Sequence, residues 1–221
     1  AEANADMVWA RGAGDGSFTI RDDISTAEGD FLQGAQAARF RKDGPLEIAL
    51  SWHQAGRGVQ FLTVPNDPFA EHWAWRRATE TSQDEDLSVG DIDRDGDPDL
   101  LLGTIWLENR SNGWVEHAIG KVTAGKPDRN DLADLDGDGR LDAVVGLENG
   151  TDVLWFRQGE DPYRPWRRDV IGRHVGGGFS MDNADIDGDG DVDVVVGEHR
   201  GKSKNRVIIY ENQAWGSEWT P

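Results

Sequence analysis

Nine residues, 185–193, constrain the fold more than any other stretch of this chain. They read Asp-Ile-Asp-Gly-Asp-Gly-Asp-Val-Asp, with acidic side chains at positions 1, 3, 5 and 9 and a glycine at position 6. Position 7 can offer its backbone carbonyl. Hard oxygen ligands at this spacing, with a glycine where the chain must turn sharply, are typical of a tight Ca²⁺ loop. The pattern occurs twice more, at 91–99 and 134–142.

The three copies predict three Ca²⁺ sites. The alternative is a solvated acidic turn, which a single copy would favour. Three copies in one register argue against it, because four or more carboxylates within nine residues repel one another unless a cation lies between them. With position 7 included, the predicted metal-binding residues are Asp91, Asp93, Asp95, Asp97, Asp99, Asp134, Asp136, Asp138, Arg140, Asp142, Asp185, Asp187, Asp189, Asp191 and Asp193.

These loops differ from EF-hands, which have a bidentate Glu at position 12 and helices on both sides. Position 12 is Leu102, Val145 or Val196 here. Each loop runs into an aliphatic or β-branched segment that ends in glycine, such as Asp-Val-Val-Val-Gly at 193–197, and such segments predict buried strands. The sequence therefore places each metal in a strand–loop–strand turn, with the Asp at position 9 as the last ligand.

Composition excludes several classes of function. The net charge of −19 disfavours nucleic acid as a partner, because phosphate binding requires Lys and Arg. The absence of cysteine excludes disulfides and thiolate metal sites. No apolar run approaches the length needed to span a membrane. Three bound Ca²⁺ would change the net charge from −19 to −13. Because cysteine is absent, metal ions are the expected cross-links.

The Asp loops mark an internal repeat. They start at 91, 134 and 185, so they are 43 and 51 residues apart, and each repeat holds the pattern of four short strands. Four strands in such a repeat predict one blade of an all-β propeller with antiparallel blades. We expect a half blade at 1–25, a degenerate blade at 26–80, and blades at 81–120, 121–172 and 173–221. About four and a half blades leave three alternatives open: part of a larger ring, an irregular five-bladed ring, or a piece completed by another chain.

The degenerate blade has Arg39 and Arg41 at loop positions 1 and 3, with Asp43 and Glu47 at positions 5 and 9. A guanidinium there replaces the cation, so we expect no metal and an ion pair between an arginine and an acid of this loop. Aromatic residues recur in two registers, which predicts packing between neighbouring blades. The first register holds Trp9, Phe61, Trp106 and Trp155, with Ile209 in the last repeat, and the second holds Phe18, Trp75, Trp114, Trp166 and Trp219.

The repeated Asp-x-Asp-x-Asp-Gly-x-x-Asp loops, each followed by a strand of the Val-Val-Gly type, resemble those of the FG-GAP/VCBS repeat family. The resemblance is strong over 85–221 and weak over 7–80. It implies a β-propeller from an extracellular or cell-envelope protein. Such propellers serve in adhesion, in carbohydrate binding, or as domains of sugar lyases and dehydratases, and the fold alone does not choose among these.

The predicted function is a secreted or envelope Ca²⁺-stabilised module that binds a glycan or a protein. The alternative is the propeller domain of a polysaccharide lyase or sugar dehydratase, although the sequence contains no motif of a known nucleophile or metalloprotease site. Trp73 and Trp215 lie outside the two registers and are predicted to be exposed. The basic insertion 199–206, which includes Lys202, Lys204 and Arg206, is either a solvated hairpin or a contact for an anionic sugar. The predicted ligand-binding residues are His53, Trp73, His199, Arg200 and Trp215.

Overall fold

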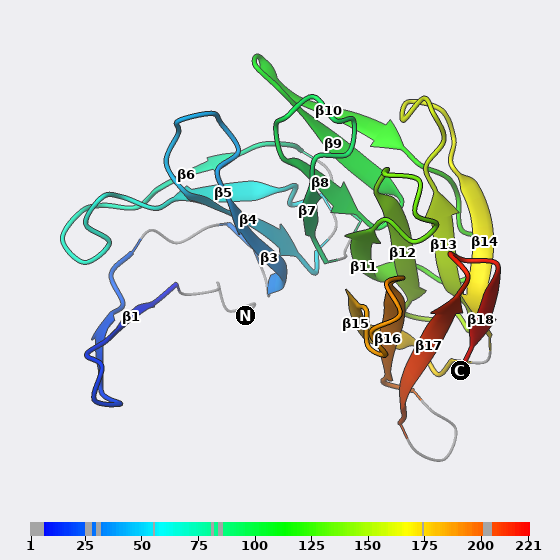
Figure 1. Ribbon diagram of the computed structural model, residues 1–221. Coiled ribbons are helices and arrows are strands. Elements are labelled where there is room, and N and C mark those ends of the chain that lie inside the picture. Colours follow the sequence, from blue (N-terminus) through cyan, green and yellow to red (C-terminus); the bar gives the residue numbers. More distant parts are fainter. Residues whose placement is uncertain are drawn as a thin grey trace. The chain divides into compact units, whose positions relative to one another are not determined.

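The computed structural model describes residues 7–24, 28–29, 32–54, 56–80, 82–83, 86–173, 175–200 and 205–221. The chain divides into two compact units, Ala1–Asp84 and Glu85–Pro221. The described residues form strands, turns and bends, and none of them belongs to a helix long and apolar enough to cross a bilayer. Every strand pairs antiparallel with its neighbour in the chain (Figure 1).

The first unit holds a two-stranded sheet and a four-stranded sheet. The two-stranded sheet consists of β1 (Trp9–Gly12) and β2 (Phe18–Arg21). Blade 1 consists of β3 (Leu32–Ala38), β4 (Glu47–Trp52), β5 (Gln60–Thr63) and β6 (Ala74–Arg77).

The second unit holds three four-stranded sheets. Blade 2 consists of β7 (Ser88–Gly90), β8 (Asp99–Leu102), β9 (Ile105–Arg110) and β10 (Gly113–Ala118). Blade 3 consists of β11 (Pro127–Ala133), β12 (Asp142–Leu147), β13 (Val153–Arg157) and β14 (Arg167–Gly172). Blade 4 consists of β15 (Gly178–Ala184), β16 (Asp193–Glu198), β17 (Val207–Gln213) and β18 (Glu218–Thr220).

The predicted fold class is confirmed: the chain is an all-β propeller protein with four-stranded antiparallel blades. Four complete blades and one two-stranded sheet correspond to the predicted four and a half. In blades 2, 3 and 4 the Asp loop connects the first strand to the second, and the second strand begins at the Asp in position 9. Each Asp loop is therefore fixed at one end of two adjacent strands.

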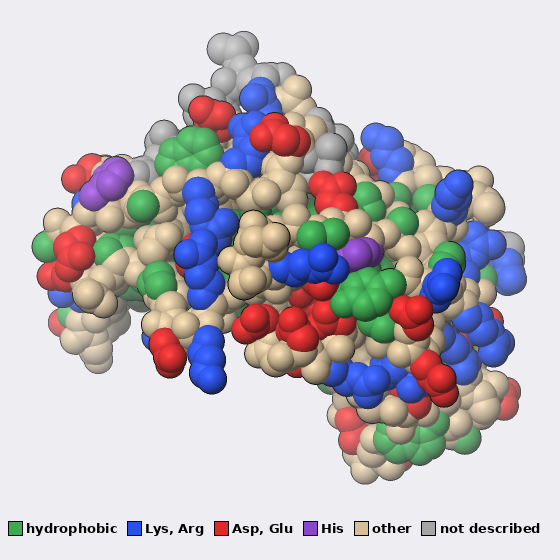
Figure 2. Space-filling view, turned by 90° about the horizontal axis from the view of Figure 1, so that it is seen from above, with side chains coloured by type: hydrophobic (Ala, Val, Ile, Leu, Met, Phe, Trp, Pro, Cys, Tyr) green, Lys and Arg blue, Asp and Glu red, His purple; other side chains and the backbone are tan. Residues whose placement is uncertain are grey.

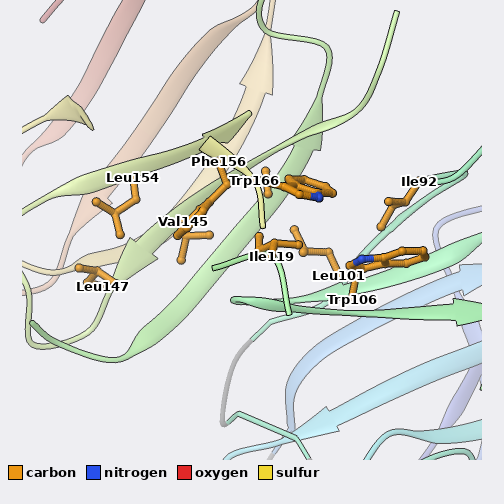
Figure 3. Packing of buried hydrophobic residues seen from close by; sticks show 10 residues of the cluster. Ile92, Leu101, Trp106, Ile119, Val145, Leu147, Leu154, Phe156 and Trp166 are labelled. Atoms are coloured by element: carbon orange, nitrogen blue, oxygen red, sulfur yellow. The ribbon is translucent and has the colours of Figure 1, made fainter. Parts of the chain in front are cut away.

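The core of the second unit lies between its blades. One cluster joins Leu101 and Trp106 of blade 2 to Val145 and Phe156 of blade 3 (Figure 3). Because alternate residues of a strand point to opposite faces, Trp155 contributes to a second cluster, between blades 3 and 4. The predicted packing of Trp106 and Trp155 between neighbouring blades is confirmed.

Trp73 corrects the second aromatic register and the predicted exposure. In blade 2, Trp114 of this register pairs with Asn109. Asn109 stands three positions after Trp106, the aromatic residue of the first register. In blade 1 the position three residues after Phe61 is Val64. Thr63 pairs with Ala74, so the next pair in this antiparallel register brings Val64 opposite Trp73. Trp73 is accordingly buried, with 1% of its surface exposed, and its Nε1 donates to the carbonyl of Pro68 at 3.0 Å. Trp166 makes the equivalent bond to Pro162, so Trp73, rather than Trp75, belongs to this register.

Blade 4 has one face that differs from the equivalent face of blade 3. Its apolar residues at the second loop position and on the third strand are exposed, whereas their counterparts in blade 3 are buried against blade 4. The exposed fractions are 46% for Ile186, 75% for Val207 and 45% for Ile209, against 0% for Leu135, 0% for Val153 and 1% for Trp155.

Candidate metal centre

Each of the three Asp loops brings carboxylate oxygens together. One oxygen from each of three residues lies within 4.8 Å of the other two, and such groups fit a metal ion. In blades 2 and 4 the residues are those at positions 1, 3 and 9, and in blade 3 they are those at positions 1, 3 and 5. The groups are Asp91, Asp93 and Asp99; Asp134, Asp136 and Asp138; and Asp185, Asp187 and Asp193.

Backbone hydrogen bonds hold the loops in this shape. In all three, the amide of the glycine at position 6 donates to the carboxylate at position 1; in blade 3 the bond runs from Gly139 to Asp134 at 2.9 Å. These glycines have φ between 84° and 102°, a range that residues with a Cβ rarely adopt. The predicted need for glycine at this position follows from that backbone angle.

The aspartate at position 9 does more than complete a ligand set. Asp193 accepts hydrogen bonds from the amide of Ile186 at 2.9 Å and from the amide of Asn212 at 2.8 Å. Asp99 accepts the equivalent bonds in blade 2, from the amides of Ile92 and Asn109. These buried carboxylates join the loop to the third strand of their own blade. Asp142 likewise accepts a hydrogen bond from the amide of Gln158, but its second bond comes from the Nε1 of Trp155. The structure groups Asp134, Asp136 and Asp138 without Asp142.

A buried carboxylate oxygen without a hydrogen-bond partner occurs in every loop. These atoms are the Oδ1 atoms of Asp91, Asp136 and Asp191. Asp191 is almost fully buried, with 3% of its surface exposed, and its other oxygen accepts the amide of Trp215. Leaving a buried carboxylate oxygen without a hydrogen bond costs free energy. Each loop therefore has negative charge and an oxygen lone pair that could coordinate a cation.

Burial also raises the pKa of two of the acids at position 9, Asp99 and Asp142. It raises the pKa of Asp99 to about 7 and that of Asp142 to about 7, and neighbouring aspartates add to the shift. A carboxyl with this pKa is only about half ionised at neutral pH in the absence of a cation. A bound divalent ion would favour the ionised form, since an opposite charge at close range lowers the pKa of an acid.

A protein-family model matches the part of the chain that contains the Asp loops of blades 3 and 4. Residues 134–196, from the first Asp of the loop in blade 3 to Val196 in β16, match the family model described as FG-GAP-like repeat. This chain carries an FG-GAP-like repeat. A search of the curated proteins gave no match.

Buried carboxamides tie the FG-GAP-like repeat to its neighbours, and sequence analysis did not single them out. Gln158 of blade 3 donates to the carbonyl of Ile92, in the Asp loop of blade 2, at 2.9 Å. Asn212 of blade 4 donates in the same way to Leu135, in the loop of blade 3, at 2.9 Å. Both residues stand three positions after the central residue of the third strand, as Asn109 does in blade 2. That recurrence of Asn or Gln was a signal that could have identified them.

The loop between the third and fourth strands of a blade provides a second link to the preceding blade. In blade 3 the hydroxyl of Tyr163 donates to Asp93 at 2.9 Å and lies 3.2 Å from a carboxylate oxygen of Glu108. In blade 4 the indole of Trp215 covers Gly137, where an added Cβ would lie 2.6 Å from the ring. An aromatic side chain of one blade thus lies against the Asp loop of the blade before it.

The degenerate loop of blade 1 does not form the predicted ion pair. Glu47 is buried and pairs with Arg76 of β6, whose Nη2 lies 3.1 Å from its Oε1. Arg39 donates to the carbonyl of Gly44 at 2.6 Å. For Glu47 the prediction was wrong, because Glu47 begins β4 and faces across its own sheet, where Arg76 can reach it.

The predicted ligand-binding residues are divided between the two units. His53 follows β4 in the first unit and is exposed, and Trp73 is buried in that unit. In the second unit, His199 and Arg200 precede β17, whereas Trp215 follows it, so β17 separates them along its length. Trp215 is 48% exposed, in agreement with its predicted exposure.

The arginines of the basic insertion have carboxylate partners. Arg200 pairs with Glu148 at 2.7 Å. Glu198 accepts a hydrogen bond from the Nε of Arg206 at 2.8 Å. Lys202 and Lys204 lie outside the described residues. An anionic sugar would therefore compete with existing ion pairs at both described arginines.

Proposed function

We propose that this chain is a Ca²⁺-stabilised β-propeller module, secreted or attached to the cell envelope, that binds a glycan or a protein ligand. The observation that carries the metal part is the set of three carboxylate groups, each in a loop with an unpaired buried carboxylate oxygen. Carboxylate-rich oxygen sites suit Ca²⁺, which takes six to eight oxygen ligands in flexible geometry, better than Zn²⁺, which prefers nitrogen and sulfur.

The Asp loops would use the metal to join blades. The ion would be held by the carboxylates at positions 1 and 3 together with position 9 or 5, and it would supply positive charge between mutually repelling acids. The same loops accept hydrogen bonds from the next blade, through Gln158 and Asn212. Metal binding to the native state therefore adds stability to the interfaces between blades.

Tyr163 is not suited to act as the base of the lyase or dehydratase alternative. Its ring contacts His117, which stacks on Trp106, and the Nε2 of His117 lies 2.8 Å from Glu108. A tyrosine that abstracts a proton must ionise readily. Burial and the carboxylates of Asp93 and Glu108 raise the pKa of the Tyr163 hydroxyl, which opposes that role.

Calcium titration tests the metal part of the proposal. The chain, first treated with chelator, is titrated calorimetrically with Ca²⁺, and bound calcium is counted by elemental analysis. We expect three ions per chain. Replacing Asp136 with Ala should leave two, since Asp136 contributes to one group only. The control is Asp161→Ala, an exposed acid outside the loops that pairs with Arg164. Absence of heat, together with an unchanged melting temperature in chelator, would refute a structural role for Ca²⁺.

A further inference from the structure

A pocket of about 270 Å³ lies on blade 3, away from the Asp loops. Its apolar side is formed by Leu147 of β12, Leu154 of β13 and Val170 of β14. Leu147 and Leu154 lie at the end of the interblade cluster farthest from Trp106 (Figure 3). The pocket is thus built on packed strands, and Thr123, in the segment between β10 and β11, also lines it.

Polar groups line the rest of the pocket. Arg168 projects from β14 and donates through Nη1 to the carbonyl of Lys121 at 3.0 Å, which fixes its position. Arg173 follows β14, and its Nη1 lies 3.6 Å from Asp152. Thr151 adds a hydroxyl. A guanidinium carries five N–H donors, so both arginines can donate to a ligand while they keep these contacts.

The pocket is locally basic in a strongly acidic protein. Two arginines and one aspartate line it, and the exposed Lys121 lies beside Arg168, whereas the whole chain carries −19. Figure 2 shows Lys and Arg side chains gathering toward the side of the molecule where Figure 1 draws β14. An anion would meet positive charge here that the rest of the chain does not offer.

We propose that this pocket binds one unit of an anionic sugar, a hydroxylated ring that carries a carboxylate or a sulfate. The proposal rests on the proposed function, since it locates a binding site on the module. The volume lies just below the range of about 300–1,000 Å³ found for drug-sized ligands, which suits a single ring.

Each part of the ring has a partner in the pocket. The C–H face of the sugar would lie against Val170, with Leu147 and Leu154 forming the nearly buried base of the pocket. Its anionic group would accept hydrogen bonds from Arg168 and Arg173, whose fork geometry matches a carboxylate or a sulfate. Its hydroxyls would reach Asp152, an acceptor, and Thr151, a donor and acceptor. A neutral sugar would leave the two guanidinium groups without an anion.

The experiment compares three probes on the full chain in Ca²⁺-containing buffer: trigalacturonate for carboxylate, a heparin disaccharide for sulfate, and maltotriose as the neutral sugar. Binding is measured by calorimetry. The pocket variant carries Arg168→Ala and Arg173→Ala. The control carries Arg164→Ala and Arg167→Ala, which removes the same charge from exposed arginines that pair with Asp161 and Asp169 outside the pocket. Circular dichroism checks that both variants fold.

We expect at least one anionic probe to bind more tightly than maltotriose. The pocket variant should lose about ten- to hundredfold in affinity, because it loses hydrogen bonds to a charged group, and the control should change little. An equal loss in both variants would overturn the pocket and indicate general charge attraction, while the binding module would stand. Binding of maltotriose alone would do the same. Absence of binding to all three probes would overturn the pocket; the calcium titration and a screen of other glycans and proteins would then decide the proposed function separately.

Discussion

At the residue scale, the buried carboxamides are the most specific links between blades. Gln158 donates to the carbonyls of Ile92 and Leu141, at 2.9 and 3.3 Å. Replacing Gln158 with Leu keeps the volume similar but leaves both carbonyls without this donor. We expect the free energy of unfolding, measured in urea, to fall by about 1–3 kcal/mol, which is the cost of unsatisfied buried polar groups.

The control for that change is Gln213→Leu, because Gln213 is only partly buried and donates to Glu211 within its own strand. Urea unfolding followed by tryptophan fluorescence measures both variants. If the two variants lose the same stability, the bond between blades contributes nothing beyond an ordinary surface amide.

Glu198 predicts how the stability of the protein changes at acidic pH. It accepts hydrogen bonds from Arg206 and from the amide of Gly176, and these hold its pKa at about 2 against an ordinary value of 4.5. A carboxyl with a depressed pKa contributes stability that is complete above pH 4.5 and is lost as the pH falls toward 2. Thermal melts of the wild type should therefore lose stability more steeply over this window than melts of Glu198→Gln.

The matched control for the acid experiment is Glu160→Gln, which removes an exposed carboxyl and should leave the wild-type slope in place. The variant Glu198→Gln should also be less stable than the wild type at pH 7. Identical slopes for Glu198→Gln and the wild type would contradict the role of the ion pair with Arg206.

The sequence did not indicate which of two tryptophans, Trp73 or Trp75, occupies the repeated aromatic position. Trp73 and Trp75 are two residues apart, so both point to the same face of a strand. A pattern with a period of two cannot decide which of them occupies the repeated position; only the pairing of Thr63 with Ala74 does. The carboxylates in the Asp loops were easier to predict, because their spacing within one loop fixes their proximity.

At the scale of elements, the β17–β18 loop shows how one blade is fixed on another. Ala214 and Trp215 have φ of 50° and 58°, which is unfavourable for residues with a Cβ. Hydrogen bonds compensate: the amide of Trp215 donates to Asp191, and the amide of Gly216 donates to Asn212. The loop is thereby held where its indole covers Gly137.

Replacing Trp215 with Ala tests this contact. We expect a loss of about 1–2 kcal/mol, less than the 3–5 kcal/mol typical of a fully buried tryptophan, because half of this side chain is exposed. We also expect weaker Ca²⁺ binding at one of the three sites, since the indole covers the Asp loop of blade 3. Calorimetric Ca²⁺ titration and urea unfolding measure the two effects.

Val207→Ala serves as the control for Trp215→Ala, because Val207 is 75% exposed at the start of β17, whereas Trp215 follows the end of that strand. It should change neither quantity by more than about 0.5 kcal/mol. An effect of Trp215→Ala on stability with all three Ca²⁺ affinities unchanged would show that the loop supports the blade but not the metal site.

These contacts between blades were not predictable from the sequence. Four strands per repeat and an Asp loop after the first strand follow from local patterns. Tyr163 and Asp93 are 70 residues apart, and no local pattern indicates that the β13–β14 loop reaches the preceding blade. Such a contact depends on how two blades are placed, which packing rather than spacing decides.

At the scale of the whole molecule, the two units should respond differently to loss of metal. The three carboxylate groups all belong to the second unit. At free Ca²⁺ one hundred times the dissociation constant, each site adds about 2.7 kcal/mol to the native state. Chelator should therefore increase amide hydrogen exchange in β8, β12 and β16, with little change in β4 and β5.

Hydrogen exchange followed by mass spectrometry, with and without chelator, measures this difference in one sample. Blade 1 is the internal control, since it shares the fold but has Arg39 and Arg41 in its loop. An equal rise in exchange in both units would mean that the metals do not act through the loops of blades 2 to 4.

The uncovered face of blade 4 has a consequence for how such a chain can evolve. Ile186, Val207 and Ile209 occupy the positions through which blades 2 and 3 receive the blade that follows. A duplicated copy of the matched repeat would meet the same apolar surface and an Asp loop of the same form. Blade number can therefore change by duplication of a single repeat, without the invention of a new interface.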